Sequence, residues 1–583
     1  MFLPITKEEV QKRGWDYVDV VLVSGDAYID HPSFGTAVIA RSLEATGLRV
    51  AILAQPNWQD DLRDFRKFGS PRLFFAITSG VMDSMVNHYT AFKRRRSDDA
   101  YTPGGKAGFR PDYATTVYSK IIRKLYPQST IILGGIEASM RRVAHYDYWS
   151  DKLKPSILID SGADMIVYGM GEKIIVSLAQ RLEKGEKIKD IKDCFQTAFI
   201  TDSLPPAPQW QTITLPSWEQ VQKDKHKQAQ SIIQVEKTSN KVIGERLAQP
   251  YDNKYVVINP FDYTFSSKDL DKTFALPYER EPHPKYKKRG AIPAFEMIKF
   301  SVNIHRGCFG GCSFCTIAAH QGKRIISRST ESILKEVNII TQQPDFKGYL
   351  SDLGGPSANM YRMGGKDETL CLNCARASCL FPARCKNLNF NHKPLLDLYA
   401  KVDSLKGIKK SFIGSGLRYD LFLSCTKEEE KLYHTTEYFE QVFLNHVSGR
   451  LKVAPEHTED KILQMMRKPS FDLFIELKRI FDQLNQRYSL FQQLIPYFIS
   501  SHPGCTMKDM QALNSKTQKL NYHLEQVQDF TPTPMTISTE SFYTGINLNN
   551  PKENIFVEHN IENKRKQKDL FFQSNQTHHN RHR

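Results

Sequence analysis

The chain has 583 residues, 40% hydrophobic and 25% charged, which is typical of a globular protein and too long for one ordinary core. We therefore expect two or three domains. Its 80 lysine and arginine residues outnumber 64 acidic ones, and the net charge of +16 is compatible with an anionic partner such as RNA or a phosphorylated substrate. No recognisable nucleic-acid-binding module accompanies this charge, so a solvated basic surface is the simpler explanation.

No segment of the sequence predicts export or a membrane partner. Residues 1–15 lack the basic start and apolar core of a secretion signal. The longest apolar stretches, such as residues 72–82, fall short of the roughly 20 apolar residues that span a bilayer. We expect a cytoplasmic protein, in which the 10 cysteines stay reduced and clustered cysteines serve as metal ligands.

Residues 1–200 alternate between apolar, β-branched runs and amphipathic runs. The first kind predicts strands at 17–25, 48–55, 71–80, 129–139 and 163–172, and the second predicts helices at 33–47, 113–128 and 173–185. Strands that are apolar throughout are typical of parallel sheets buried on both faces, so we predict a doubly wound α/β domain. Several strands end in glycine, which indicates either a ligand site at the carboxyl edge of the sheet or ordinary tight turns.

Residues 201–291 are rich in proline and charge and predict a connector. From residue 292 the alternation resumes, with strands expected at 295–307, 347–355, 409–417, 449–456 and 490–504 and a helix at 329–340. Repeated βα units over residues 292–550 predict a full or partial (β/α) barrel. Residues 551–583 are polar and basic, and we expect a disordered tail.

A glycine-rich loop carries Cys308, Cys312 and Cys315 in a C-x3-C-x2-C spacing, directly after a predicted strand. Three thiolates at this spacing can surround one face of a four-iron cluster and leave its fourth iron without a protein ligand. An open iron is a site of chemistry, as an open zinc position is. The alternatives are three buried thiols or a zinc site completed by a distant ligand.

This spacing, with an aromatic residue before the third cysteine, resembles the signature of the radical S-adenosylmethionine (SAM) superfamily. The resemblance implies that the three cysteines bind one 4Fe–4S cluster and that SAM chelates the open iron. It implies reductive cleavage of SAM to a 5′-deoxyadenosyl radical, with an electron donor of the flavodoxin or ferredoxin type. It also implies that four further residues bind the cofactors: Phe314, Gly354, Gly355 and Arg418. At the next strand end, Lys452, Glu456 and His457 belong either to the site or to a surface salt-bridge set.

Over nearly its full length the chain is similar to the YgiQ family of radical SAM proteins. The similarity rests on seven stretches, which are residues 24–35, 276–286, 304–322, 351–361, 414–420, 452–460 and 499–506. It implies the architecture and the cofactors and leaves the substrate and the reaction open. We expect a radical SAM enzyme acting on an unknown substrate, which the charge allows to be anionic or RNA.

The first domain resembles the cobalamin-binding domain that precedes many radical SAM barrels. The ligating pattern of such domains is Asp-x-His-x-x-Gly, whereas Asp30 and His31 are adjacent here. This argues against cobalamin but leaves it open, because related domains bind cobalamin without that histidine. One alternative function is therefore a cobalamin-dependent radical SAM methyltransferase. The other is a non-catalytic iron–sulfur protein that binds nucleic acid.

A second cysteine group has the spacing C-x2-C-x4-C-x5-C and consists of Cys371, Cys374, Cys379 and Cys385. Four thiols so close together suggest a closed metal site, either zinc or a second iron–sulfur cluster, with unligated thiols as the alternative. Three more cysteines are isolated. Cys194 and Cys425 read as ordinary buried thiols, and Cys505, at a predicted strand end, is a weak candidate for a substrate-side residue.

Overall fold

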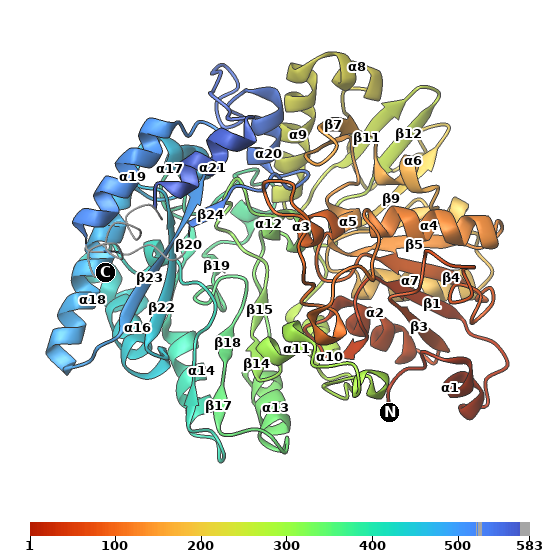
Figure 1. The fold of residues 1–583 in the computed structure, drawn as a ribbon, viewed down its shortest axis with the longest axis horizontal. Coiled ribbons are helices and arrows are strands. Elements are labelled where there is room, and N and C mark those ends of the chain that lie inside the picture. Colours follow the sequence, from red (N-terminus) through yellow and green to blue (C-terminus); the bar gives the residue numbers. More distant parts are fainter. Residues whose placement is uncertain (521, 523–526, 572–583) are drawn as a thin grey trace, which may run out of the picture. The chain divides into compact units, whose positions relative to one another are not determined.

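The computed structural model describes residues 1–520, 522 and 527–571, and the chain divides into two compact units (Figure 1). Unit 1 comprises Met1–Lys299 together with Ala319–Gly322, and unit 2 comprises the rest. Among the described residues, no helix combines the length and the apolar character needed to cross a membrane.

Unit 1 is built on a nine-stranded sheet with the order β10-β11-β12-β9-β8-β5-β4-β1-β3. The five strands from β8 to β3 are parallel and confirm the predicted doubly wound domain, with the order 2-1-3-4-5 that is common in such sheets. The strands of the sheet are β1 (Val20–Ser24), β3 (Val50–Ala54), β4 (Phe74–Thr78), β5 (Ile131–Gly134), β8 (Met165–Val167), β9 (Thr197–Thr201), β10 (Thr212–Thr214), β11 (Arg246–Tyr251) and β12 (Lys254–Ile258).

Helices cover both faces of the parallel strands, because each buried strand presents apolar side chains to both sides. Helices α2 (Gly35–Glu44) and α7 (Glu172–Glu183) share one hydrophobic cluster with the strands, whereas on the opposite face Phe75 stacks on Tyr126, just after α4 (Ala114–Leu125), with ring centroids 5.3 Å apart. The remaining elements of unit 1 are α1 (Lys7–Lys12), β2 (Ile29–Asp30), α3 (Ser84–His88), η1 (Pro103–Gly105), α5 (Gly135–Ser139), β6 (His145–Asp147), β7 (Lys152–Lys154), α6 (Ile157–Ser161), η2 (Ile188–Asp190), α8 (Trp218–Lys223), α9 (Lys225–Asn240), α10 (Ser267–Phe274), β13 (Glu281–Pro282), η3 (Pro284–Tyr286) and α11 (Pro293–Ile298).

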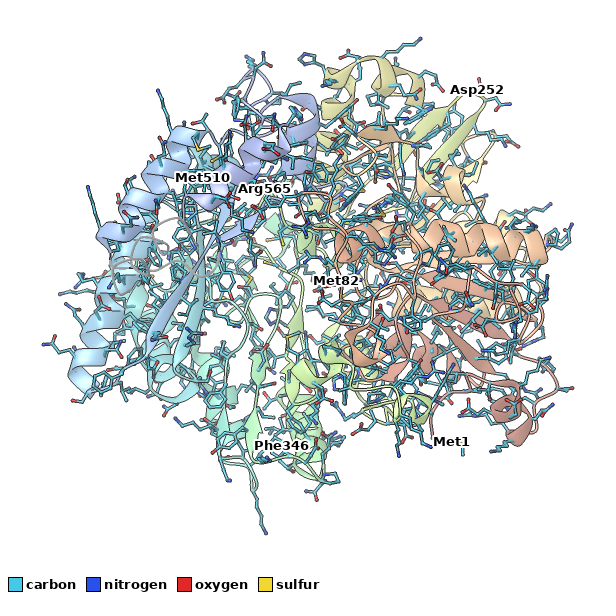
Figure 2. The ribbon with its side chains drawn as sticks, in the orientation of Figure 1. Met1, Met82, Asp252, Phe346, Met510 and Arg565 are labelled. Atoms are coloured by element: carbon cyan, nitrogen blue, oxygen red, sulfur yellow. The ribbon has the colours of Figure 1, made fainter. Side chains whose placement is uncertain are left out.

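The predicted connector over residues 201–291 is wrong, because this range contributes strands β10, β11 and β12 to the sheet. Strands β11 and β12 form a hairpin in which Tyr251 pairs with Lys254, so Asp252 and the next residue make a two-residue turn. Asp252, labelled in Figure 2, has a φ of +49°, which aspartate tolerates in hairpin turns. The prolines and charges of residues 201–291 suggested a connector, and the prediction did not take this turn into account.

Unit 2 is a partial (β/α) barrel, which confirms the predicted fold class. Parallel ladders join β14 to β18, β17 to β21, and β22 to β23 to β24, and α18 and α19 flank the last three (Figure 1). The strands are β14 (Ser301–Asn303), β15 (His305–Arg306), β16 (Ile326–Ser327), β17 (Tyr349–Leu350), β18 (Asp352–Gly354), β19 (Gly364–Gly365), β20 (Leu388–Asn389), β21 (Lys410–Ser411), β22 (Arg450–Glu456), β23 (Gln493–Ser500) and β24 (Val527–Asp529).

Helices and helical turns separate these strands, and apolar side chains from most of them join the strands in one large hydrophobic core. They are α13 (Thr330–Thr341), η4 (Thr369–Cys371), α14 (Lys393–Asp403), η5 (Tyr419–Leu421), α15 (Lys427–Tyr433), α16 (Thr435–Gln441), η6 (Val442–His446), α17 (Asp460–Met466), α18 (Phe471–Tyr488), α19 (Met507–Lys519), α20 (Ile537–Thr544) and α21 (Ile561–Asp569), and a further helix, α12 (Ile317–Gln321), spans the boundary between the two units.

The strand expected at 295–307 begins later than predicted. Pro293 occupies the first turn of a short helix, α11, where its fixed φ and missing N–H are favourable, and β14 starts only at Ser301.

The disordered tail predicted over residues 551–583 is wrong in its first part. Helix α21 (Ile561–Asp569) packs on the barrel, and the buried Gln567 accepts a 2.9 Å hydrogen bond from the Ser501 hydroxyl through its side-chain oxygen. The helix is so hydrophilic that its sequence gave no sign of its few buried side chains. The rest of the predicted tail, residues 572–583, lies outside the described residues.

Candidate functional site

The loop of Cys308, Cys312 and Cys315 follows β14 and β15, at the carboxyl end of the first barrel strand. Burial raises the pKa of Cys308 and raises that of Cys315 to about 12, and the charges of neighbouring cysteines add to both shifts. Cys312 acts on both of the other thiols, so the three sulfurs lie within electrostatic reach of one another. Thiolates in such surroundings need a compensating positive charge, which a metal cluster supplies.

Ser313 holds the middle of this loop in place. Its hydroxyl donates a 2.7 Å hydrogen bond to the Met465 carbonyl and lies 2.8 Å from the Ser538 hydroxyl. Gly311 has a φ of +63°, and a Cβ there would overlap the carbonyl group of Ala377. The loop therefore has a fixed path. Nothing in the sequence pointed to Ser313, because both of its partners are far away along the chain.

Arg418 lies against the sulfur of Cys312, to which its Nη1 donates a 3.2 Å hydrogen bond. Two further hydrogen bonds, of 2.9 and 2.5 Å, join the guanidinium to Asp420, and Asn359 fixes the backbone of Arg418 through two reciprocal bonds of 2.9 Å. A Cβ on Gly310 would lie 2.9 Å from Nη1, so the glycine makes room for this approach. The resemblance implies that Arg418 binds the cofactors, and the structure places its guanidinium beside a cysteine of the loop.

The ion pair of Arg418 and Asp420 stays charged despite its burial. Burial works against the charge of Arg418, but Asp420 and Cys312 raise its pKa well above the usual value. Burial likewise would raise the pKa of Asp420, but Arg418 holds it below the ordinary range. A permanent positive charge therefore stands beside Cys312.

Of the glycine pair predicted to bind the cofactors, Gly354 ends strand β18 and Gly355 follows it directly. A Cβ on Gly355 would lie 2.5 Å from Cε1 of His305, and a Cβ on Gly354 would lie 2.9 Å from the Ser415 hydroxyl. His305 is completely buried, and burial lowers its pKa to about 3, so the imidazole is neutral. Neither of its ring nitrogens has a hydrogen-bond partner among the described residues. Buried polar atoms are rarely left this way.

Glu456 ends strand β22 with a φ of +70°, a strained conformation for a non-glycine residue. Burial raises the pKa of Glu456, and Lys468, at 3.8 Å, opposes the shift. The charge of Glu456 also contributes to the raised pKa of Cys315. Of the three residues left undecided at this strand end, Glu456 is the one near the cysteine loop, whereas Lys452 is exposed.

His457 and Cys505 face each other in the interior of unit 2, with the sulfur 3.5 Å from Nε2. Cys505 belongs to the hydrophobic core and is 1% exposed, so the weak expectation of a substrate-side role finds no support. The ring of Phe314 meets the ring of His502 edge to face, with centroids 6.4 Å apart.

The second cysteine group occupies the segment between β19 and β20, where all four thiols are partly buried. Within the described parts of the chain, no three His, Cys, Asp or Glu side chains are grouped as ligands of a metal ion. An iron–sulfur cluster attaches each thiolate to its own iron, so its ligands need not meet at one ion.

The glycines at the strand ends of unit 1 serve the packing of turns. This favours ordinary tight turns over a ligand site at the carboxyl edge of the sheet. Gly80, with a φ of +113°, stands against the carboxylate of Asp26, where a side chain would collide. The buried Arg110 lies 2.8 Å from Asp26 and 3.0 Å from Asp99. Burial raises the pKa of Asp26 to about 6, and Arg110 limits the shift. Ion pairs thus occupy the sheet edge between β1 and β4, where ligands often bind in such folds.

His31 does not fit the role of a cobalt ligand. It is completely buried, its Nδ1 accepts a 3.1 Å hydrogen bond from the Ser33 amide, and its Nε2 lies 3.2 Å from Nη1 of Arg280. Both ring nitrogens are engaged within unit 1, so neither is offered to a corrin.

Two solved structures of the radical S-adenosylmethionine methyltransferase TsrM from Kitasatospora setae are distantly similar to the chain. The form with cobalamin and a [4Fe-4S] cluster bound is 14% identical, with a TM-score of 0.49 and coverage of 89% of this chain and 77% of that one. The form with tryptophan substrate and a SAM analog gives a TM-score of 0.45 and covers 89% of this chain and 75% of that one. Similarity at this level carries no argument about cofactors or reaction.

Sequence relatives are much closer. UPF0313 proteins are 58% identical in Bacteroides thetaiotaomicron (93% of this chain, 89% of that protein), 55% in Porphyromonas gingivalis (93% and 86%) and 46% in Methanocella arvoryzae (96% and 91%). The sequence model of the Radical SAM N-terminal family matches residues 2–301, more than half of the chain. The chain therefore belongs to the radical SAM family, together with the UPF0313 proteins.

Proposed function

We propose that Cys308, Cys312 and Cys315 hold the 4Fe–4S cluster of this radical SAM enzyme and leave one iron to bind SAM. The family implies both cofactors, and within it we assign the chain to the YgiQ group on the seven stretches of similarity. The observation that carries the residue assignment is the hydrogen bond from the buried Arg418 to the Cys312 sulfur, whose charge also raises the pKa of both Cys308 and Cys315.

The residues around the loop stabilise and tune what the cysteines bind. An electron from the reduced cluster would cleave SAM to methionine and a 5′-deoxyadenosyl radical that abstracts hydrogen from the substrate. Arg418 donates to the Cys312 sulfur, and the Gly310 amide donates a 3.4 Å bond to the Cys308 sulfur. Such donors withdraw charge from the sulfurs and raise the reduction potential of a cluster. Asp420 keeps the guanidinium in place.

We assign the polar end of SAM to the edge formed by Gly354, Gly355 and His305. SAM brings an ammonium and a carboxylate, and His305 offers two buried ring nitrogens without partners among the described residues. Gly355 keeps the backbone against the imidazole free of a side chain. Because Glu456 is buried and lies within electrostatic reach of Cys315, it is a further candidate to receive a positive group of SAM.

The first experiment incubates the anaerobically reconstituted protein with SAM and dithionite and measures methionine and 5′-deoxyadenosine. The proposal expects both products from the native chain and from Cys425→Ala, a control outside both cysteine groups. It expects neither from Cys312→Ala. Native protein that forms no more product than Cys312→Ala would refute the assignment.

The same preparation separates the alternatives that the sequence left open. A cobalamin-dependent methyltransferase predicts a corrin absorbance spectrum that stays with the protein after gel filtration. A non-catalytic nucleic-acid-binding protein predicts RNA binding that falls steeply with salt and no cleavage of SAM. We further propose a cytoplasmic location and a physiological electron donor of the flavodoxin or ferredoxin type.

A further inference from the structure

The segment that carries the second cysteine group has almost no apolar core of its own. Residues 366–387 join β19 to β20 and contain only one helical turn, η4. The structure describes all of these residues, and Ser378 alone among them is buried. Leu370 is 66% exposed. Loops of this length with so little apolar packing do not normally keep one conformation, so another kind of link is expected to hold the segment together.

Four cysteines lie within the fifteen residues from Cys371 to Cys385. Backbone bonds draw the cysteines together in pairs, since the Cys374 amide donates to the Cys371 carbonyl at 3.2 Å and the Cys385 amide to the Cys379 carbonyl at 2.8 Å.

Two polar side chains act as hydrogen-bond donors to these sulfurs. The side-chain amide of Asn387 donates a 3.4 Å hydrogen bond to the Cys371 sulfur. The ammonium of Lys323 lies 3.9 Å from the Cys374 sulfur and donates a 2.7 Å hydrogen bond to the Arg376 carbonyl. Donors of this kind stabilise thiolates and are typical of the surroundings of metal-bound sulfur.

The segment also supports the loop of Cys308, Cys312 and Cys315. The Cys379 amide donates a 3.0 Å hydrogen bond to the carbonyl of Phe309, and Gly311 lies directly against the backbone of Ala377. Cys308, Cys379 and Cys385 pack against one small hydrophobic cluster, formed by Phe309, Met360, Met363, Leu388, Phe390, Leu421 and Tyr433. A change in residues 366–387 would therefore reach the first loop.

We propose that Cys371, Cys374, Cys379 and Cys385 bind a second 4Fe–4S cluster, which fixes residues 366–387 behind the first cysteine loop. With four thiolates, every iron has a protein ligand, so this cluster is closed to SAM and substrate. The donors to the sulfurs and the position beside the first loop favour a cluster over a zinc ion.

The first test is the iron, sulfide and zinc content of the full chain after anaerobic reconstitution. The proposal expects about eight irons per native chain and about four in a variant with Cys308, Cys312 and Cys315 all changed to serine. That variant keeps the second group intact, so its iron does not depend on the proposed SAM chemistry. A first-loop variant that retains no iron, or one zinc instead, would overturn the proposal.

A double variant tests the same ligands by removing two cysteines of the second group. Cys374→Ser/Cys385→Ser is expected to hold about four irons or fewer, because the support behind the first loop weakens as well. Cys425→Ser, which changes a partly buried cysteine packed against the same hydrophobic cluster, is expected to hold the native amount. Native iron content in the double variant would contradict the assignment.

Trypsin provides a readout that does not depend on substituting the second group. In the first-loop variant, Arg376 and Arg384 lie within the segment that the second cluster would fix. Cleavage after these arginines is expected to be slow in the iron-loaded variant and at least tenfold faster after chelation. Equal cleavage rates would show that no cluster fixes the segment.

Discussion

Replacing Arg418 with methionine tests whether the guanidinium beside Cys312 serves the cysteine loop. Arg418 is 8% exposed and makes two hydrogen bonds to Asp420 and one to the Cys312 sulfur. Removing one member of a buried ion pair leaves the other charge uncompensated, at a cost of about 3–5 kcal/mol. Because the two side chains keep 10% and 12% exposure, we expect the lower end of this range, about 3 kcal/mol, in the iron-free protein.

The pH dependence of this loss has a defined sign. Arg418 holds the pKa of Asp420 below its ordinary value, so the pair contributes stability above that value and loses it as the pH falls. In the variant, burial acts on Asp420 without its partner and raises the pKa. The stability difference between native protein and variant should therefore be largest near neutral pH and shrink toward about pH 4.

Urea unfolding of the iron-free protein under anaerobic, reducing conditions measures this difference. The double variant Arg418→Met/Asp420→Asn removes both charges and should recover much of the loss. In reconstituted protein, a redox titration of the SAM-responsive cluster should give a more negative potential for Arg418→Met, because a positive donor to sulfur is gone. A stability difference below about 1 kcal/mol at every pH, together with an unchanged potential, would refute the role of Arg418.

Three further substitutions test the surrounding structure. Gly355→Ala places a Cβ 2.5 Å from His305 Cε1 and should abolish the response of the cluster to SAM while iron is retained. The control is Gly416→Ala, because the space around its Cβ is open. Equal responses to SAM in the two variants would contradict the assignment. Ser313→Ala should cost about 1 kcal/mol and speed the loss of iron to a chelator, so unchanged chelation kinetics would count against an anchoring role. Asp26→Asn removes a carboxyl whose pKa burial raises to about 6. Asp26 contributes stability at low pH that is lost as the pH rises through about 6. The free energy of unfolding of the variant, relative to that of the native protein, should therefore rise by up to about 3 kcal/mol between about pH 4 and pH 8. A difference that does not change with pH would contradict this.

The parallel half of unit 1 was predictable because strands buried on both faces leave continuous apolar runs. Each of the five predicted strands contains an observed one, from β1 to β8. Strands β11 and β12 escaped prediction, since β11 mixes polar with apolar residues, β12 has only the short apolar run of residues 255–258, and the turn at Asp252 lacks glycine. Helix α21 escaped because a strongly charged helix needs only a few buried contacts to dock.

The candidate site was predictable only where its signal is local in sequence. The spacing of Cys308, Cys312 and Cys315 lies within one loop and is readable directly. Arg418 and Cys312 are 106 positions apart in the sequence, and Ser313 and Ser538 are 225 apart. Neither contact could therefore be predicted from a local pattern. Which strand-end residues face the cysteines depends on the closure of the barrel, and this separates Glu456 from Lys452.

The most direct test of the central claim, that Cys308, Cys312 and Cys315 leave one iron open to SAM, is electron paramagnetic resonance of the reduced protein with and without SAM. The account predicts a signal that shifts when SAM is added, and the loss of this response in Cys312→Ala. A native signal indifferent to SAM, or a SAM response that survives the loss of Cys312, would contradict it.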